Sequence, residues 1–171
     1  TVVLTEEGLP AGTYTIQAGP KTISFNIDES GNMVDIDSSV ILESAEEIVI
    51  TLERTPCFGF CPTYTVEIHE DGRVIYNGIA NVDVIGEQNG QISEAAMQSL
   101  VEAFYNVGYF ELADEYTEQY VTDMPSTITS ITIDGMKKRI NRYDGDDSAP
   151  VALQELEILI DKLVNSEQWT G

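Results

Sequence analysis

Alternating apolar and polar residues in the first 46 positions predict a small β unit. Residues 13–18 and 22–28 alternate in this way, and the Gly-Pro dipeptide between them is typical of a turn. Residues 28–32, with the sequence Asp-Glu-Ser-Gly-Asn, predict a second turn that leads into a strand at residues 33–37. Polar residues and adjacent carboxylates then interrupt the pattern. We therefore divide the chain into residues 1–46 and 47–171.

A further strand is predicted at the very beginning of this β unit, where three apolar residues follow one another. This predicted assembly segment consists of Thr1, Val2, Val3, Leu4 and Thr5. An extended segment can add a strand to the exposed edge of a sheet, in its own chain or in another copy. Donation of the strand from copy to copy would build a filament.

The second predicted domain begins with strands. Residues 64–69 alternate, the sequence Glu-Asp-Gly-Arg at residues 70–73 is typical of a turn, and residues 74–77 return as the second strand of a hairpin. Another hairpin is predicted at residues 127–143, because the Asp-Gly dipeptide at its centre is typical of a type I′ turn. Two more strands are predicted at residues 48–53 and 79–85.

Two amphipathic helices complete the second domain. Ser93 is a good N-cap for the first helix, and Gly108 stands where a helix end favours a left-handed residue. Pro150 opens the second helix. The apolar faces consist of Met97, Leu100, Val101, Phe104 and Tyr105 in the first helix and of Leu153, Leu156, Ile160 and Leu163 in the second. We therefore predict an α+β fold, in which a mostly antiparallel sheet carries two helices on one face and is preceded by the small N-terminal β unit.

The net charge of −22 narrows the range of partners. Thirty Asp and Glu residues stand against eight Lys and Arg residues, so the chain would repel the phosphates of a nucleic acid. The carboxylates are dispersed, which is typical of a solvated surface in saline or calcium-containing surroundings, although a cytosolic protein of a halophile has the same composition. No apolar run approaches the ~18 residues of a membrane helix, so we expect no transmembrane segment.

Both cysteines lie in residues 54–64, which we call the cysteine box. Cys57 and Cys61 indicate a local disulfide in an oxidising compartment, the alternative being two reduced, inert thiols. His69 follows along a predicted strand, about 26 Å from Cys61 at ~3.3 Å per residue, which is too far for a shared zinc site. The thiols also lack an activating Cys-x-x-Cys spacing. We expect the cysteine box to be a stapled corner, packed with its aromatic residues, that does no chemistry.

No catalytic residue is assigned from the sequence. The chain has one histidine and no Gly-x-Ser-x-Gly motif, and its many carboxylates single out no pair. Asp144, Asp146 and Asp147 gather oxygens at a turn, as calcium prefers, but they do not fit the EF-hand loop. They form either a weak calcium site or a solvated turn, and we expect no other cofactor.

Half of the eight basic residues are close together in the predicted second hairpin: Lys137, Lys138, Arg139 and Arg142. This cluster could dock against an acidic face of another copy. The alternative, which we favour, is that these residues pair with nearby acids within the chain.

Residues 53–64 and 71–78 resemble a family of bacterial domains of unknown function. The family signature, Arg-Thr-x-Cys-Phe-Gly-x-Cys-Pro-x-Tyr, is matched here from Arg54 to Tyr64. The later segments 123–127 and 133–135 fit the same pattern, and the resemblance covers residues 48–169. Members often occur in secreted or lipid-anchored envelope proteins. The resemblance therefore implies a secreted, cell-surface or periplasmic location, and it implies no established activity.

Three functions remain open. The first is a non-enzymatic extracellular or envelope protein that contacts other copies of itself or another envelope protein, with self-assembly into a filament through residues 1–5. The second is a small-ligand binder or enzyme, with Asp114, Glu115 or Asp123 placed against Arg54 and Tyr64. The third is a monomeric envelope module that binds calcium.

Overall fold

The structure is a computed structural model, and it describes residues 10–18, 21–31, 33–36, 47–118 and 122–171. The chain divides into two compact units, Thr1–Ala45 and Glu46–Gly171, each of which is described by itself. The predicted assembly segment lies outside the described residues, so its role stays a prediction.

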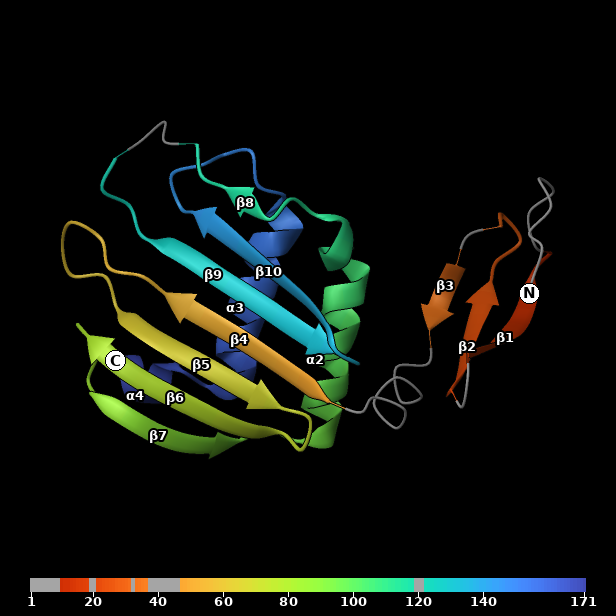
Figure 1. The fold of residues 1–171 in the computed structure, drawn as a ribbon, viewed down its shortest axis with the longest axis horizontal. Coiled ribbons are helices and arrows are strands. Elements are labelled where there is room, and N and C mark those ends of the chain that lie inside the picture. The colour runs from red at the N-terminus through yellow and green to blue at the C-terminus, as the bar shows by residue number, and fades with distance from the viewer. Residues whose placement is uncertain (1–9, 19–20, 32, 37–46, 119–121) are drawn as a thin grey trace. The chain divides into compact units, whose positions relative to one another are not determined.

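The first unit contains an antiparallel sheet in the order β1-β2-β3 (Figure 1). Its strands are β1 (Gly12–Ala18), β2 (Lys21–Ile27) and β3 (Met33–Ile36). Phe25 and Ile27 of β2 are buried, and Phe25 stacks on Tyr14 with 5.7 Å between the ring centroids. The N–H of Gly31 donates to the carbonyl of Asp28, which closes the predicted turn before β3. The small N-terminal β unit is confirmed.

The second unit is built on a seven-stranded sheet in the order β7-β6-β5-β4-β9-β10-β8. Its strands are β4 (Ile48–Arg54), β5 (Thr63–His69), β6 (Arg73–Ala80), β7 (Gly86–Gln91), β8 (Glu115–Tyr116), β9 (Ser126–Ile133) and β10 (Met136–Tyr143). Neighbouring strands are antiparallel except β8 and β10, which are parallel. Asp134 and Gly135 have φ angles of 52° and 75°, as the predicted type I′ turn requires.

The helices α2 (Glu94–Asn106) and α3 (Val151–Val164) cover one face of this sheet (Figure 1). The hydroxyl of Ser93 accepts a hydrogen bond from the N–H of Ala96, so it caps α2 as predicted. A 3₁₀ turn, η1 (Tyr109–Glu111), follows α2, and the short helix α4 (Glu167–Thr170) follows α3. The α+β fold is confirmed. In the described part of the chain, no helix is long and apolar enough to cross a membrane.

The core lies between the sheet and the two helices. Alternate residues of β4 (Ile48, Ile50 and Leu52) point into it, because successive side chains of a strand face opposite sides. Strand β5 adds Tyr64, Val66 and Ile68. The buried helix residues are Met97, Leu100, Val101 and Phe104 in α2 and Leu153, Leu156, Ile160 and Val164 in α3. Apolar periodicity thus predicts most of the helix residues in the core. The exceptions are Tyr105 and Leu163, which are only half-buried, and Val164, which is buried although it was not predicted.

The predicted strand at residues 79–85 is wrong. Ile79 and Ala80 end strand β6, the next residues turn, and β7 occupies Gly86–Gln91. Strand β7 contains only glycine and polar residues, because it lies at the edge of the sheet and pairs only with β6. One of its glycines, Gly90, leaves room for the ring of Trp169, which a Cβ atom would approach to 3.1 Å.

Candidate functional site

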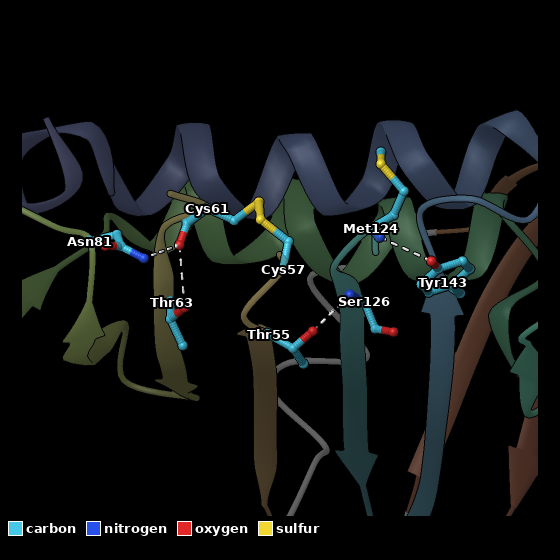
Figure 2. Close-up of a disulfide and its surroundings, with 8 residues drawn as sticks. All are labelled: Thr55, Cys57, Cys61, Thr63, Asn81, Met124, Ser126 and Tyr143. Atoms are coloured by element: carbon cyan, nitrogen blue, oxygen red, sulfur yellow. Dashed lines mark hydrogen bonds between the residues drawn. A yellow bond between two sulfur atoms is a disulfide. The ribbon is translucent and has the colours of Figure 1, made fainter. Parts of the chain in front are cut away.

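The cysteine box connects β4 to β5 at one end of the sheet, and Cys57 and Cys61 form a disulfide (Figure 2). The loop is fastened on both sides. Thr55 exchanges two hydrogen bonds with Ser126: its N–H donates to the Ser126 carbonyl at 3.0 Å, and its hydroxyl accepts from the Ser126 N–H at 2.7 Å. The carbonyl of Cys61 accepts hydrogen bonds from Thr63 and Asn81. The loop is therefore a fixed part of the sheet end.

The phenylalanines of the cysteine box face the solvent. Phe58 is 89% exposed and Phe60 is 92% exposed, so the expectation of a corner packed with aromatic residues is wrong. Both lie within the short loop that the disulfide closes, after the last core residue of β4 and before the first core residue of β5. The N–H of Phe58 donates to the carbonyl of Asp123, which places the next residue, Met124, beside the box. Met124 is 43% exposed and adds a third apolar side chain.

Beneath the loop, Arg54 and Asp161 join the sheet to helix α3. Arg54 donates to Asp161 Oδ2 at 2.7 Å and to the hydroxyl of Thr127, also at 2.7 Å. The other carboxylate oxygen of Asp161 accepts from the hydroxyls of Tyr64 at 2.7 Å and Ser166 at 2.8 Å. The carboxylate of Asp161, in α3, thus links strands β4 and β5 to the helix and to Ser166, which lies between α3 and α4.

A second charged pair lies one helical turn earlier on α3. Arg142 of β10 donates to both carboxylate oxygens of Glu157, at 2.9 and 2.6 Å, and both side chains are almost fully buried. Arg142 also forms an ion pair with Asp144 at 2.9 Å. Asp144 in turn accepts a hydrogen bond from Thr127 at 3.4 Å, which connects this pair to Arg54. We call the connected side chains of Arg54, Tyr64, Thr127, Arg142, Asp144, Glu157, Asp161 and Ser166 the polar network.

Burial sets the protonation behaviour of the network. It raises the pKa of the Tyr64 hydroxyl, and the neighbouring charge of Asp161 raises it further, so Tyr64 stays neutral and donates its proton to Asp161. Burial also raises the pKa of Glu157 in spite of its bonds to Arg142. For Arg142, burial lowers the pKa, but its bonds to Glu157 outweigh this and the net direction is upward. The pKa of Arg54 is also raised by its ion pair with Asp161, which outweighs burial, so Arg54 and Arg142 both remain charged.

A cavity of about 260 Å³ opens between the cysteine box and the polar network. It is lined by Arg54, Thr55, Cys61, Pro62, Tyr64, Pro125, Asp144 and Thr170. The sequence hypothesis of a ligand site placed Asp114, Glu115 or Asp123 against Arg54 and Tyr64, but the carboxylate that lines the cavity is Asp144. Asp114 instead pairs with Lys138.

The three aspartates of the predicted calcium site have separate partners or surroundings. Asp144 belongs to the polar network, Asp147 is exposed, and Asp146 accepts hydrogen bonds from the N–H groups of Glu118 and Ser148, each at 2.8 Å. Within the described ranges, no group of three or more His, Cys, Asp or Glu side chains could hold a metal ion. The calcium site stays a prediction without support from the structure.

Part of the basic cluster pairs within its own unit, as we favoured. Lys138 contacts Asp114 and donates to the Leu112 carbonyl at 2.6 Å, and Arg142 pairs with Glu157 and Asp144.

Sequence reasoning missed the acidic half of the polar network. The available signal was a pair of carboxylates, Glu157 and Asp161, spaced four residues apart next to the apolar face of the last helix. An acidic residue that faces a core needs a cation or hydrogen-bond donors from other elements. That signal could have pointed to Arg54 and Arg142.

The sequence pattern of one known family, described as "Domain of unknown function (DUF6438)", matches residues 48–164. The chain belongs to the DUF6438 family. The matched residues run from the first residue of β4 to the last residue of α3. The DUF6438 region therefore includes the cysteine box and seven of the eight residues of the polar network, all except Ser166. No curated protein matches the chain.

Proposed function

We propose that this chain is a non-enzymatic bacterial protein of the cell surface, periplasm or extracellular space, and that its DUF6438 domain binds another protein through the cysteine box. The observation that carries the proposal is the exposure of Phe58 and Phe60, 89% and 92%, on a loop closed by a disulfide. Adjacent large apolar side chains that remain exposed in a folded domain are typical of an interaction site.

The anchoring of the loop supports this role. A loop fixed before binding loses little conformational entropy when a partner arrives, so more of the contact energy appears as affinity. The disulfide and the hydrogen bonds from Phe58 to Asp123 and between Thr55 and Ser126 provide that fixation. Met124 extends the apolar surface beside the phenylalanines. Aromatic side chains, phenylalanine among them, are enriched at protein interfaces.

The location is proposed from two arguments. Disulfides persist in oxidising compartments outside the cytosol. The match to the Arg-Thr-x-Cys-Phe-Gly-x-Cys-Pro-x-Tyr signature, from Arg54 to Tyr64, favours a bacterial envelope protein. Self-assembly through the predicted assembly segment is a compatible proposal. Deletion of residues 1–8 tests it separately, because oligomers of unchanged size would exclude strand donation.

A small-molecule enzyme is the weaker alternative. The cavity of about 260 Å³ contains Arg54 and Tyr64, but Arg54 donates to Thr127 and Asp161, and the Tyr64 hydroxyl donates to Asp161. These groups are therefore engaged in holding the sheet to α3. The phenylalanines, in contrast, have no such role in the fold.

A comparison of two double variants tests the proposal. Phe58→Ser with Phe60→Ser removes the exposed aromatics, and Ile85→Ser with Val151→Ser removes two side chains that are 62% and 68% exposed elsewhere. Wild type and both variants are immobilised and exposed to an envelope extract of the source organism. We expect a protein that wild type and the Ile85/Val151 variant retain, and whose retention falls at least about tenfold in the Phe58/Phe60 variant. Equal retention by all three proteins would exclude the cysteine box as the binding site.

A further inference from the structure

We infer that the cavity beside the cysteine box receives a lysine or arginine side chain of the partner protein, and that Asp144 pairs with its cationic head. This inference rests on the proposed function and specifies the chemistry of the partner. The charges, the bonding and the walls of the cavity all favour a basic segment of a protein as the ligand.

The charges of the polar network leave one carboxylate in surplus. Arg54 pairs with Asp161, and Arg142 pairs through three hydrogen bonds with Glu157. Each of these pairs is neutral. Asp144 is the remaining charge. It shares a nitrogen of Arg142 with Glu157, whose contact with that nitrogen is shorter, at 2.6 Å compared with 2.9 Å for Asp144. The network therefore carries a net charge of about −1, located at Asp144, when all five groups are ionised.

Asp144 also has an oxygen left for a ligand. Its contacts with Arg142 and Thr127 both involve Oδ1. Among the described residues, none donates a hydrogen bond to Oδ2. The side chain of Asp144 is 27% exposed and lines the cavity. A charge-assisted hydrogen bond from an ammonium or guanidinium group to this oxygen needs no rearrangement of the network.

The remaining walls suit the stem of a long basic side chain. Cys61, Pro62 and Pro125 contribute apolar surface next to the polar groups. Lysine and arginine bury their methylene stems against such surface while the charged head reaches a polar partner. The volume of about 260 Å³ is below the ~300–1,000 Å³ of common ligand pockets, so it fits one inserted side chain better than a cofactor.

The rim of the cavity is continuous with the proposed binding surface. Cys61 lines the cavity and closes the loop that carries Phe58 and Phe60. Pro125 lines it from the neighbouring segment, next to the exposed Met124. A partner segment that packs on the phenylalanines therefore passes the mouth of the cavity. The protein's net charge of −22 attracts a basic segment and repels an acidic one.

The opposite chemistry, an acidic side chain against Arg54, is disfavoured by the charges. Arg54 lines the cavity, but its charge is already neutralised by the ion pair with Asp161. A carboxylate ligand would also lie near the surplus charge of Asp144, which lines the same cavity.

Nuclear magnetic resonance titration of the full, isotope-labelled chain tests the inference with three capped heptapeptides, Gly-Leu-Gly-Xaa-Gly-Leu-Gly. Xaa is arginine, its uncharged isostere citrulline, or glutamate. We expect the arginine peptide to shift the amide signals of Thr55, Cys61, Asp144 and Thr170 and to bind about tenfold more tightly than the citrulline peptide. Added salt should remove most of this difference, because the discriminating contact is between charges.

Matched variants locate the contact. Asp144→Asn should lower the affinity for the arginine peptide to that of the citrulline peptide, whereas Asp147→Asn, which removes an exposed charge nearby, should leave it unchanged. The salt dependence of wild type provides a second measurement that needs no variant. The inference is overturned if the arginine and citrulline peptides bind equally or if the glutamate peptide binds best. It is also overturned if no peptide binds or if the shifted signals belong only to other residues.

The two proposals can fail separately. If the Phe58/Phe60 variant loses its protein partner but the arginine peptide shows no preference, the basic-segment inference is wrong and the binding surface stands. If the arginine peptide binds at Asp144 but the Phe58/Phe60 variant retains every protein that wild type retains, the binding surface is wrong.

Discussion

Arg54 and Asp161, which are 107 residues apart in sequence, meet at 2.7 Å and join the end of strand β4 to the end of helix α3. Arg54 is the last residue of β4 and the first residue of the cysteine box. The same guanidinium bonds Thr127 at the start of β9. The base of the exposed loop is thus tied to a neighbouring strand and to the helix that covers the sheet.

Loss of Arg54 should destabilise the second unit. In Arg54→Met, Asp161 keeps its hydrogen bonds from Tyr64 and Ser166 but loses its cation. We expect the free energy of unfolding to fall by about 2 kcal/mol, as for other hydrogen bonds between charged groups. Urea denaturation measures this change.

The matched control is Arg73→Met. The Arg73–Asp71 ion pair is 4.0 Å long and both side chains are well exposed, so its loss should change the free energy of unfolding by less than about 0.5 kcal/mol. Equal effects of the two substitutions would mean that the Arg54–Asp161 bond does not fasten α3 to the sheet.

The buried pair of Arg142 and Glu157 should behave differently as single and double variants. Arg142→Met leaves the Glu157 carboxylate buried without its cation, which should cost about 3–5 kcal/mol of unfolding free energy. Replacing both residues with methionine removes both charges and fills similar space. The double variant should therefore regain most of that loss, since burial already opposes the ionised form of Glu157 by raising its pKa. Denaturation of the two variants in parallel decides the point, and a double variant no more stable than Arg142→Met would contradict it.

The sequence predicts local structure in this protein better than it predicts the site. The Asp134-Gly135 turn and the cap at Ser93 depend on neighbouring residues, and both are as predicted. Strand β7 was missed because an edge strand need not alternate. The pairing of Arg54 with Asp161 depends on the order of strands in the sheet, which no local pattern records.

The sequence also does not predict which side chains of the cysteine box are exposed. Phenylalanine is usually buried, so the sequence predicts a packed corner around Phe58 and Phe60. The disulfide between Cys57 and Cys61 holds them in a loop beyond the sheet, and their exposure became visible only with the fold. The residues that the pattern placed wrongly are those on which the proposed function rests.

Asp146 should make the second unit sensitive to acid. Hydrogen bonds from the side chain and N–H of Ser148 and from the N–H of Glu118 lower the pKa of Asp146 in the folded protein. The unfolded chain therefore binds the proton at higher pH than the folded chain. The stabilisation by Asp146 is complete above its unfolded pKa of about 3.9 and is lost as the pH falls through the folded pKa.

Melting temperatures at two pH values check this expectation. Asp146→Asn should melt below wild type at about pH 6. The difference should shrink at about pH 3, because this pH lies below the unfolded pKa of about 3.9, where the stabilisation by the lowered pKa of Asp146 begins to be lost. Asp147→Asn, at an exposed neighbouring position, should show no such dependence. A difference between wild type and Asp146→Asn that is the same at both pH values would rule out a contribution from the Asp146 charge.

The disulfide should contribute modestly to stability and more strongly to binding. Cys57 and Cys61 close a loop of only a few residues, so replacing both with serine should lower the free energy of unfolding by about 2 kcal/mol on the chain-entropy model. Thr55 and Ser126 still hold the base of the loop in this variant. The loop that carries Phe58 and Phe60 loses its closure, however, and must be ordered again by the partner. Retention of the partner in the extract experiment should therefore fall while the fold persists. Circular dichroism and partner retention, measured on the same sample, check this expectation.

Two outcomes would contradict it. A variant that unfolds completely would mean that the disulfide holds the whole domain together. A variant that retains the partner fully would mean that loop closure does not prepare the phenylalanines for binding.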